Sequence, residues 1–398
     1  MPMKNSLPFL LALLLILPFS SCSHRQTSTG KATVIDLLSG LNNTKDIKLS
    51  DIADEITYIP LETKADCMLS SDLSLTATDE GYIMLEGGII FRVFDKDGKF
   101  IRNVGSSGKG PGEYLRARQF SIDKKARVIE VASIFTLKMV LYSFEGKFLR
   151  EYPMPFDAAY VVKEPSGGYH LATYRPQPKD SAEYRFSRMD NQGKIVQIFP
   201  EKGVVLPSSG IMLKEFQYYT YNDQVYLQNA FNDTIYRFTK GAWVPDLYFD
   251  LGSFSPPKEY WDDIKFNAKN RGQFIERVGF TDEQDYLLVF FRHKKKSEIG
   301  KYDKASKTLT YVQNIDTISR GFLNDLDGGP GVKPLWNEND GKYWYLTFQA
   351  VDLIDWKAKG YFDQADIKHP EQNKKLKAMI DRLTVDSNPV IMKVRQKK

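Results

Sequence analysis

Apolar and polar residues alternate along short stretches of this chain, and turns rich in small or polar residues separate these stretches. Residues 89–94 alternate before a turn at Gly98, and residues 99–104 alternate after it. Alternation with period two indicates β-strands, and Asp-Gly at the bend allows the positive φ of a tight hairpin. The chain is therefore predicted to contain antiparallel hairpins.

The same turn recurs at a nearly constant interval. Glycines at positions 98, 146, 193 and 241 are separated by 48, 47 and 48 residues, and a glycine-free copy covers residues 301–309. Unrelated hairpins would not produce this spacing, whereas a β-propeller with one blade per repeat does. We therefore predict an all-β fold, a β-propeller.

The length of the chain predicts the number of blades. Residues 22–398 amount to 377 residues, enough for six blades of about 48 residues with insertions. Five turns mark five blades, and the sixth must combine a strand at 55–61 with strands at 342–348 and 389–394. Sharing the last blade between both ends closes the ring without an exposed edge strand.

Two segments interrupt the repeat, at about 255–278 and at 355–387. Pro257 suits the start of a helix in the first, and Leu376, Met379, Ile380 and Leu383 form one apolar helical stripe in the second. The predicted strand directions place both helical insertions on one face of the propeller. They either decorate the rim or form the wall of a pocket.

The N-terminus has the features of an export signal. Lys4 precedes an apolar stretch at 7–18, which is followed by Phe-Ser-Ser-Cys at 19–22. Small residues before Cys22 resemble the lipobox of bacterial lipoproteins, which implies that Cys22 is lipidated. We expect a signal peptide at 1–21, a lipid-anchored tether at 22–45 and the propeller at 46–398. The alternative is an ordinary secretory signal with a chance cysteine.

Charge and composition argue against several classes of binding and catalysis. The formal net charge is +5, or +4 without residues 1–21, and no concentrated basic segment predicts nucleic-acid binding. Cys67 would have no partner for a disulfide and is expected to be a buried thiol rather than a nucleophile. The four histidines lack metal-ligand spacing, so we predict no metal and no cofactor.

Several segments together resemble a known family. They are Gly-Ser-Ser-Gly-Lys-Gly-Pro-Gly-Glu-Tyr at 105–114, Ile-Pro-Leu-Glu-Thr at 59–63, Asn-Asp-Leu-Asp-Gly-Gly-Pro at 324–330 and Ser-Asn-Pro-Val at 387–390. With the repeated turn, they resemble the six-bladed β-propeller lipoproteins of Bacteroidetes, which are related to NHL-repeat proteins. The resemblance implies a lipid-anchored protein of the cell envelope, at the outer membrane and near nutrient-uptake systems.

Two of these segments share features with ligand-binding loops. Residues 105–112 lack the spacing of a phosphate-binding P-loop and are better explained as a turn between blades. Residues 324–329 carry closely spaced oxygen ligands, but the distal glutamate of a calcium loop is missing. A structural Asp/Gly turn is the favoured interpretation there, and a cation loop is the alternative.

The blade pattern predicts a candidate ligand site. The starts of the innermost strands and the ends of the second strands should gather at one mouth of the channel. The candidate residues are Arg116, Arg118, Tyr174, Arg175, Arg277, Arg292, His293 and Asp325. Arginines with aromatic neighbours favour a ligand that carries carboxylates or phosphates. The alternative is that these are solvated loop residues or salt-bridge partners.

Three functions fit this pattern. The first is a membrane-anchored, non-catalytic binding or scaffold module that captures a small anionic solute, a glycan or a peptide, or docks on an uptake complex. The second is a lyase or hydrolase acting on a glycan or peptide, with Glu86 and Asp325 as a pair of catalytic carboxylates. The third is a structural interaction domain that docks through its inserted helices.

Overall fold

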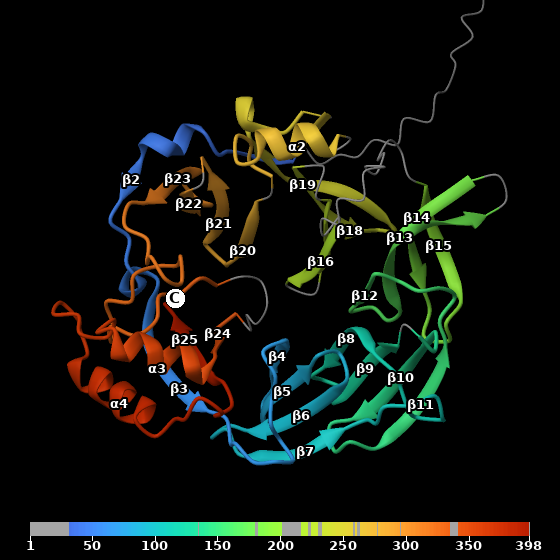
Figure 1. Ribbon diagram of the computed structural model, residues 1–398. Coiled ribbons are helices and arrows are strands. Elements are labelled where there is room, and N and C mark those ends of the chain that lie inside the picture. The colour runs from blue at the N-terminus through green and yellow to red at the C-terminus, as the bar shows by residue number, and fades with distance from the viewer. Residues whose placement is uncertain are drawn as a thin grey trace, which may run out of the picture.

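Six small sheets surround a central axis as the blades of a β-propeller (Figure 1). This computed structural model describes residues 32–397 except 134, 180–181, 201–215, 222–223, 230–232, 258, 261–262, 277, 295 and 335–340. Blade 1 contains β4 (Leu73–Ala77), β5 (Gly81–Glu86), β6 (Ile90–Asp95) and β7 (Phe100–Val104). Blade 2 contains β8 (Ala117–Asp123), β9 (Val128–Ser133), β10 (Lys138–Ser143) and β11 (Phe148–Pro153).

The next three blades follow the same order from the axis outward. Blade 3 contains β12 (Tyr160–Lys163), β13 (Tyr169–Lys179), β14 (Ala182–Met189) and β15 (Ile195–Pro200). Blade 4 contains β16 (Phe216–Tyr221), β17 (Gln224–Asn229), β18 (Thr234–Thr239) and β19 (Ala242–Asp250). Blade 5 contains β20 (Gly279–Asp282), β21 (Tyr286–His293), β22 (Lys296–Asp303) and β23 (Thr308–Val312). The six-bladed propeller predicted from the repeat is confirmed.

The recurring turn joins the third and fourth strands of blades 1 to 5. Gly98, Gly146, Gly193 and Gly241 have φ values of 83°, 85°, 87° and 78°, so all four lie in the left-handed region. In the glycine-free copy, Lys307 takes this conformation with a φ of 56°. The regular spacing therefore reflects one hairpin geometry repeated around the ring.

Both ends of the chain share blade 6, as predicted. β24 (Tyr343–Phe348) pairs with β25 (Val390–Gln396), and β25 pairs with β3 (Ala53–Pro60), all antiparallel. The described part of blade 6 has these three strands. One face packs on blade 5 through a cluster that includes Trp344 and Met392, and the other packs on blade 1 through Ile59 and Ile391.

The N-terminal segment differs from the expected tether. β1 (Thr33–Asp36) adds to blade 4 beside β19, and β2 (Thr44–Lys45) adds to blade 5 beside β23, both parallel. Ile35 and Leu37 are fully buried in the core between these blades. The short 3-10 helices η1 (Ser39–Asn42) and η2 (Leu49–Asp51) connect this segment to β3. Residues 33–45 therefore belong to the propeller, and its boundary lies before residue 46.

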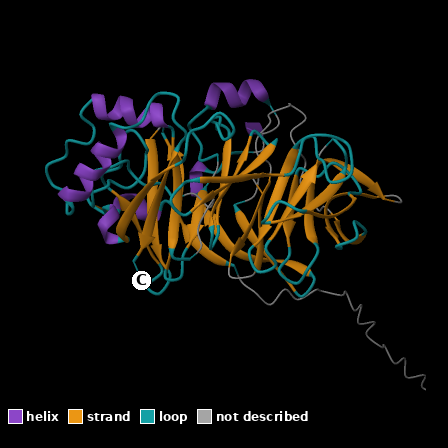
Figure 2. Ribbon diagram, turned by 90° about the horizontal axis from the view of Figure 1, so that it is seen from below, coloured by secondary structure: helices purple, strands orange, loops and turns teal. Residues whose placement is uncertain are grey.

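The helices gather on one face of the disc (Figure 2). α2 (Ile264–Asn270) follows the 3-10 helix η3 (Gly252–Phe254) between blades 4 and 5, whereas α3 (Ala350–Ala358) and α4 (Pro370–Ile380) connect β24 to β25. Leu376 and Ile380 of the predicted apolar stripe are buried against Leu353 of α3. None of the described helices is long and apolar enough to cross a membrane. The two helical insertions predicted on one face are confirmed.

Candidate functional site

The described part of the structure includes the side chains of four residues predicted at the channel mouth, which are Arg116, Arg292, His293 and Asp325. Arg116 and Arg292 are exposed. His293 is buried and packs edge-on against Phe254, with a distance of 4.3 Å between ring centroids. Burial lowers the pKa of this histidine, so it is neutral at physiological pH. Arg277 and the side chains of Arg118, Tyr174 and Arg175 lie outside the described residues.

Asp325 has a structural role rather than a position at the start of an innermost strand. Its carboxylate accepts hydrogen bonds from the Ser50 backbone N–H at 2.9 Å and the Ser50 hydroxyl at 2.7 Å. Lys368 lies 3.7 Å from the same carboxylate. Residues 325–327 form a turn, so the strand expected there is wrong. Asp325 ties the N-terminal segment and the helical insertion to blade 6.

The neighbouring Asp327 explains the Asp/Gly motif. Its Oδ1 accepts hydrogen bonds from the Asn324 amide at 2.7 Å, the Gly329 N–H at 2.9 Å and the Tyr58 hydroxyl at 3.2 Å. Asn373 of α4 donates to the Asp327 carbonyl at 2.7 Å, which fastens the helix to the turn. Within the described ranges, no group of acidic, histidine or cysteine side chains could hold a metal ion. The motif is a structural turn, as favoured from its sequence.

The two carboxylates considered for catalysis are each engaged in other interactions. Glu86 forms an ion pair with Arg92 at 2.7 Å and accepts a hydrogen bond from the Ser70 N–H at 2.8 Å. Asp325 is held by Ser50 and Lys368, as described above. Both carboxylates therefore have a cationic partner within the protein.

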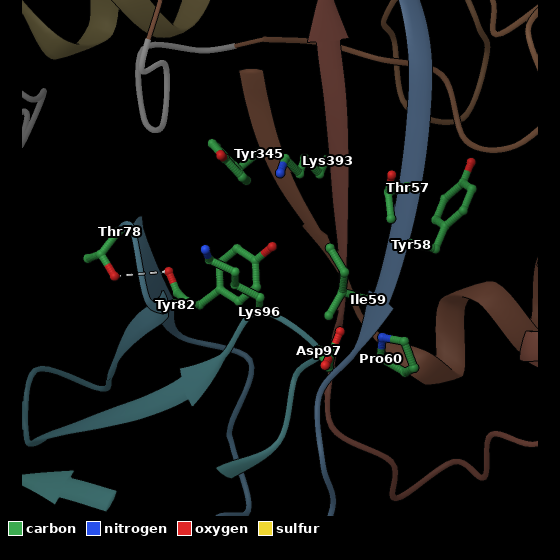
Figure 3. A pocket seen from close by; sticks show the side chains of 11 residues that line it. Thr57, Tyr58, Ile59, Pro60, Thr78, Tyr82, Lys96, Asp97, Tyr345 and Lys393 are labelled. Atoms are coloured by element: carbon green, nitrogen blue, oxygen red, sulfur yellow. Dashed lines mark hydrogen bonds between the residues drawn. The ribbon is translucent and has the colours of Figure 1, made fainter. Parts of the chain in front are cut away.

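A pocket lies where the ring closes, between blade 6 and blade 1 (Figure 3). Its volume is about 290 Å³. The lining residues are Thr57, Tyr58, Ile59, Pro60, Thr78, Gly81, Tyr82, Lys96, Asp97, Tyr345 and Lys393. We call this the closure pocket, because one wall comes from both ends of the chain and the other from the hairpin turns of blade 1.

Strand register builds the blade 6 wall. Tyr345 is paired with Lys393, and Lys393 is paired with Thr57, so these three side chains form one row across the sheet. Tyr58 points to the opposite face of β3, as its hydrogen bond to Asp327 requires (Figure 3). The alternation of a β-strand therefore separates the pocket face from the face that packs on blade 5 and on the 324–330 turn.

Blade 1 supplies the opposite wall. Tyr82 lies in β5, and its ring centroid is 6.1 Å from that of Tyr345, in an edge-on arrangement. Thr78 donates a hydrogen bond to the Gly81 carbonyl at 3.2 Å, which fixes the adjacent turn. Lys96 and Asp97 reach the pocket from the recurring turn that contains Gly98. Figure 3 shows Tyr82 and Lys96 on the side facing Tyr345 and Lys393.

Two ammonium groups give the closure pocket its electrostatic character. The Nζ atom of Lys393 lies 4.0 Å from the centroid of the Tyr343 ring, a cation–π contact that positions it. Within the described residues, neither Lys96 nor Lys393 forms an ion pair. Burial and the Asp97 carboxylate raise the pKa of Tyr82, so its phenol remains a neutral hydrogen-bond donor. The arrangement can hold an anionic group beside aromatic rings.

The sequence also matches a defined family over all the residues that line this pocket. The profile of DUF4934, a domain of unknown function, matches residues 32–395. The chain belongs to the DUF4934 family. No curated protein matches this DUF4934 chain.

Solved structures show the same fold. An exported protein of Bacteroides fragilis NCTC 9343 is 19% identical to this DUF4934 protein and superposes with a TM-score of 0.68 over 92% of this chain and 100% of that one. A DUF4221-family member from Bacteroides vulgatus is 10% identical, with a TM-score of 0.49 over 89% of this chain and 98% of that one. The first of these supports the propeller fold.

Sequence reasoning missed the closure pocket of this DUF4934 protein. Its walls combine Thr57, Tyr82 and Lys96 with Tyr345 and Lys393, from opposite ends of the chain. The sequence feature that could have indicated this pocket is the predicted sharing of blade 6 by both ends of the chain. That prediction brings β3 beside β25, but it does not reveal which face of the sheet remains uncovered.

Proposed function

We propose that this DUF4934 protein is a non-catalytic binding propeller of the cell envelope that captures a small anionic ligand in the closure pocket. The observation that carries the proposal is that Lys96 and Lys393, which form no ion pair within the described residues, line the same pocket as Tyr82 and Tyr345. The N-terminal pattern of residues 1–22 supports export and anchoring through a lipid on Cys22. Capture outside the cell membrane would suit a protein attached in this way.

The composition of the closure pocket favours one acidic group and several hydroxyls on the ligand. Two ammonium groups, of Lys96 and Lys393, and one carboxylate, of Asp97, leave the pocket with one excess positive charge. This excess favours a ligand with a single negative charge. The Thr57 hydroxyl and tyrosine phenols suit polar groups, and the aromatic rings suit the apolar face of a sugar or side chain. A volume of about 290 Å³ is at the small end of ligand pockets. Sugar acids and short acidic peptides fit this description.

Isothermal titration calorimetry on residues 32–398 tests the proposal. The probes are galacturonate, the neutral sugar galactose, and a dipeptide with a free carboxylate. Lys393→Met should weaken binding of the acidic probe about tenfold, equivalent to about 1.4 kcal/mol, because a charge-assisted contact is lost. Lys147→Met is the matched control. Lys147 is an exposed lysine that does not line the closure pocket, and it lies in the blade 2 copy of the turn that contains Lys96.

Two results would count against the proposal. One is binding of an acidic probe that survives Lys96→Met and Lys393→Met together. The other is equal affinity for galacturonate and galactose, which would leave the two lysines without a role in recognition.

A further inference from the structure

Exposed large apolar side chains are distributed unevenly over the propeller. Within the described residues, they occur on the outer strands, in the connections between second and third strands or between blades, and in the helices. Those on the outer strands are Val34, Ile101, Phe148, Leu149, Val196 and Tyr248. Those in the connections and helices are Met68, Ile89, Phe135, Leu137, Ile264, Ile318, Val351 and Val385.

Three of these side chains are brought together by blades 1 and 2. Ile89 lies in the turn between β5 and β6, and Phe135 and Leu137 lie in the turn between β9 and β10. The Ala117 N–H donates a hydrogen bond to the Gly88 carbonyl at 2.6 Å, and Ala117 is also paired with Ser133. The start of β8 therefore lies beside both turns.

The exposure of this surface is high for apolar residues. Ile89 is 51% exposed, Phe135 is 66% exposed and Leu137 is 41% exposed. Arg116 is also exposed, and its side chain passes close to Gly88 in the first of these turns. We call Ile89, Arg116, Phe135 and Leu137 the blade 1–2 patch.

The backbone conformation of Leu137 is energetically unfavourable for leucine. Its φ is +47°, in the left-handed region that glycine and asparagine adopt far more readily than a bulky apolar residue. The turn would therefore form more easily with a different side chain. Strain retained at an exposed position is a reason to look for a function of the side chain itself.

We propose that the blade 1–2 patch docks a partner protein that presents an apolar side chain next to a carboxylate. The carboxylate would pair with Arg116, which forms no ion pair among the described residues. Protein interfaces are enriched in aromatic residues and arginine, as this patch is. An anionic membrane surface typically attracts clusters of about four to eight basic residues, whereas the patch contains one.

Photo-crosslinking in cells that naturally make the full chain tests this docking. A photoreactive phenylalanine analogue replaces Phe135, and the same analogue at Val196 is the control, because Val196 is 54% exposed on an outer strand. We expect the analogue at position 135 to give one discrete protein adduct. The yield of this adduct should be at least tenfold lower with the analogue at position 196. Adding Arg116→Glu should reduce the adduct at position 135 at least tenfold.

Four outcomes would overturn the docking proposal. They are the absence of an adduct at position 135, adducts of equal strength at both positions, an adduct unaffected by Arg116→Glu, and an adduct to lipid or to a second copy of the chain. The melting temperature of the Arg116→Glu variant shows whether any loss comes from misfolding. It should remain within about 1 °C of the parent, because exposed substitutions of this kind change stability little.

Discussion

The recurring turn allows a matched test of why glycine occupies it. Gly193→Ala and Gly241→Ala alter the same hairpin position, and the two glycines have φ values of 87° and 78°. The left-handed backbone costs alanine about 1 kcal/mol, partly offset by a smaller loss of chain entropy on folding. Backbone strain alone therefore predicts nearly equal, small losses of stability for the two substitutions.

The surroundings of the two glycines predict a large difference instead. A Cβ at Gly193 would lie 2.1 Å from the Pro153 carbonyl oxygen of blade 2, whereas a Cβ at Gly241 would have nothing within 4 Å. The blade 3 turn would have to move, which would strain the two Asp190 hydrogen bonds that brace it, both 2.9 Å. Each is worth about 1 kcal/mol. We expect a loss of about 3 kcal/mol for Gly193→Ala and about 1 kcal/mol or less for Gly241→Ala.

Urea unfolding of residues 32–398, followed by tryptophan fluorescence and circular dichroism, measures both free energies of unfolding. Agreement between the two signals is needed, because a chain of this size can unfold through intermediates. Equal losses for the two variants would refute the reasoning. They would mean that close contact between the turn and the preceding blade does not constrain this position.

Three further predictions concern buried groups and the closure pocket. Burial outweighs the nearby Glu164 carboxylate and lowers the pKa of His170 to about 4, below its value in the unfolded chain. Protonation of His170 in the unfolded chain should therefore remove about 3 kcal/mol of stability between pH 6.5 and pH 4, in addition to the effect of the carboxylates. Urea titrations of His170→Phe should show a loss of stability smaller by about 3 kcal/mol over this range. Asp327→Ala removes the acceptor of three hydrogen bonds and should cost about 4 kcal/mol, with faster proteolysis of α3 and α4 in the folded protein. A closure-pocket ligand at 100 times its Kd should add about 2.7 kcal/mol to the free energy of unfolding, and Lys393→Met should reduce that gain at the same ligand concentration.

The repeated hairpins could be predicted because their cause is local. Asp-Gly, Glu-Gly and Gln-Gly specify a left-handed residue wherever they fall between alternating strands, and four equally spaced glycines show that conformation. The strands of the N-terminal segment could not be predicted in the same way. β1 has four residues and β2 has two, so neither is long enough to show alternation. Their pairing depends on outer strands that only the assembled blades provide.

The channel-mouth prediction shows what strand register leaves open. Register correctly placed His293 at the end of a second strand, but the side chain packs on Phe254 instead of facing solvent. Asp325 was placed by assuming an innermost strand, whereas the chain forms a turn whose carboxylates bond to Ser50 and Tyr58. Position along a blade follows from sequence spacing. The direction in which a side chain points and the groups that it contacts depend on neighbours contributed by distant segments.

The closure pocket follows from the same distinction between local and distant causes. Within each of blades 1 to 5, the four main strands follow one another in the sequence, so each sheet is built from neighbouring segments. At the closure, Thr57 and Lys393 come from opposite ends of the chain and meet only when β3 pairs with β25. A ligand held there would contact blade 6 and blade 1 together, and its binding energy would add to the stability of the closed ring. Affinity and unfolding measured on the same variants therefore separate a defect in recognition, which changes only binding, from a defect in closure, which changes both.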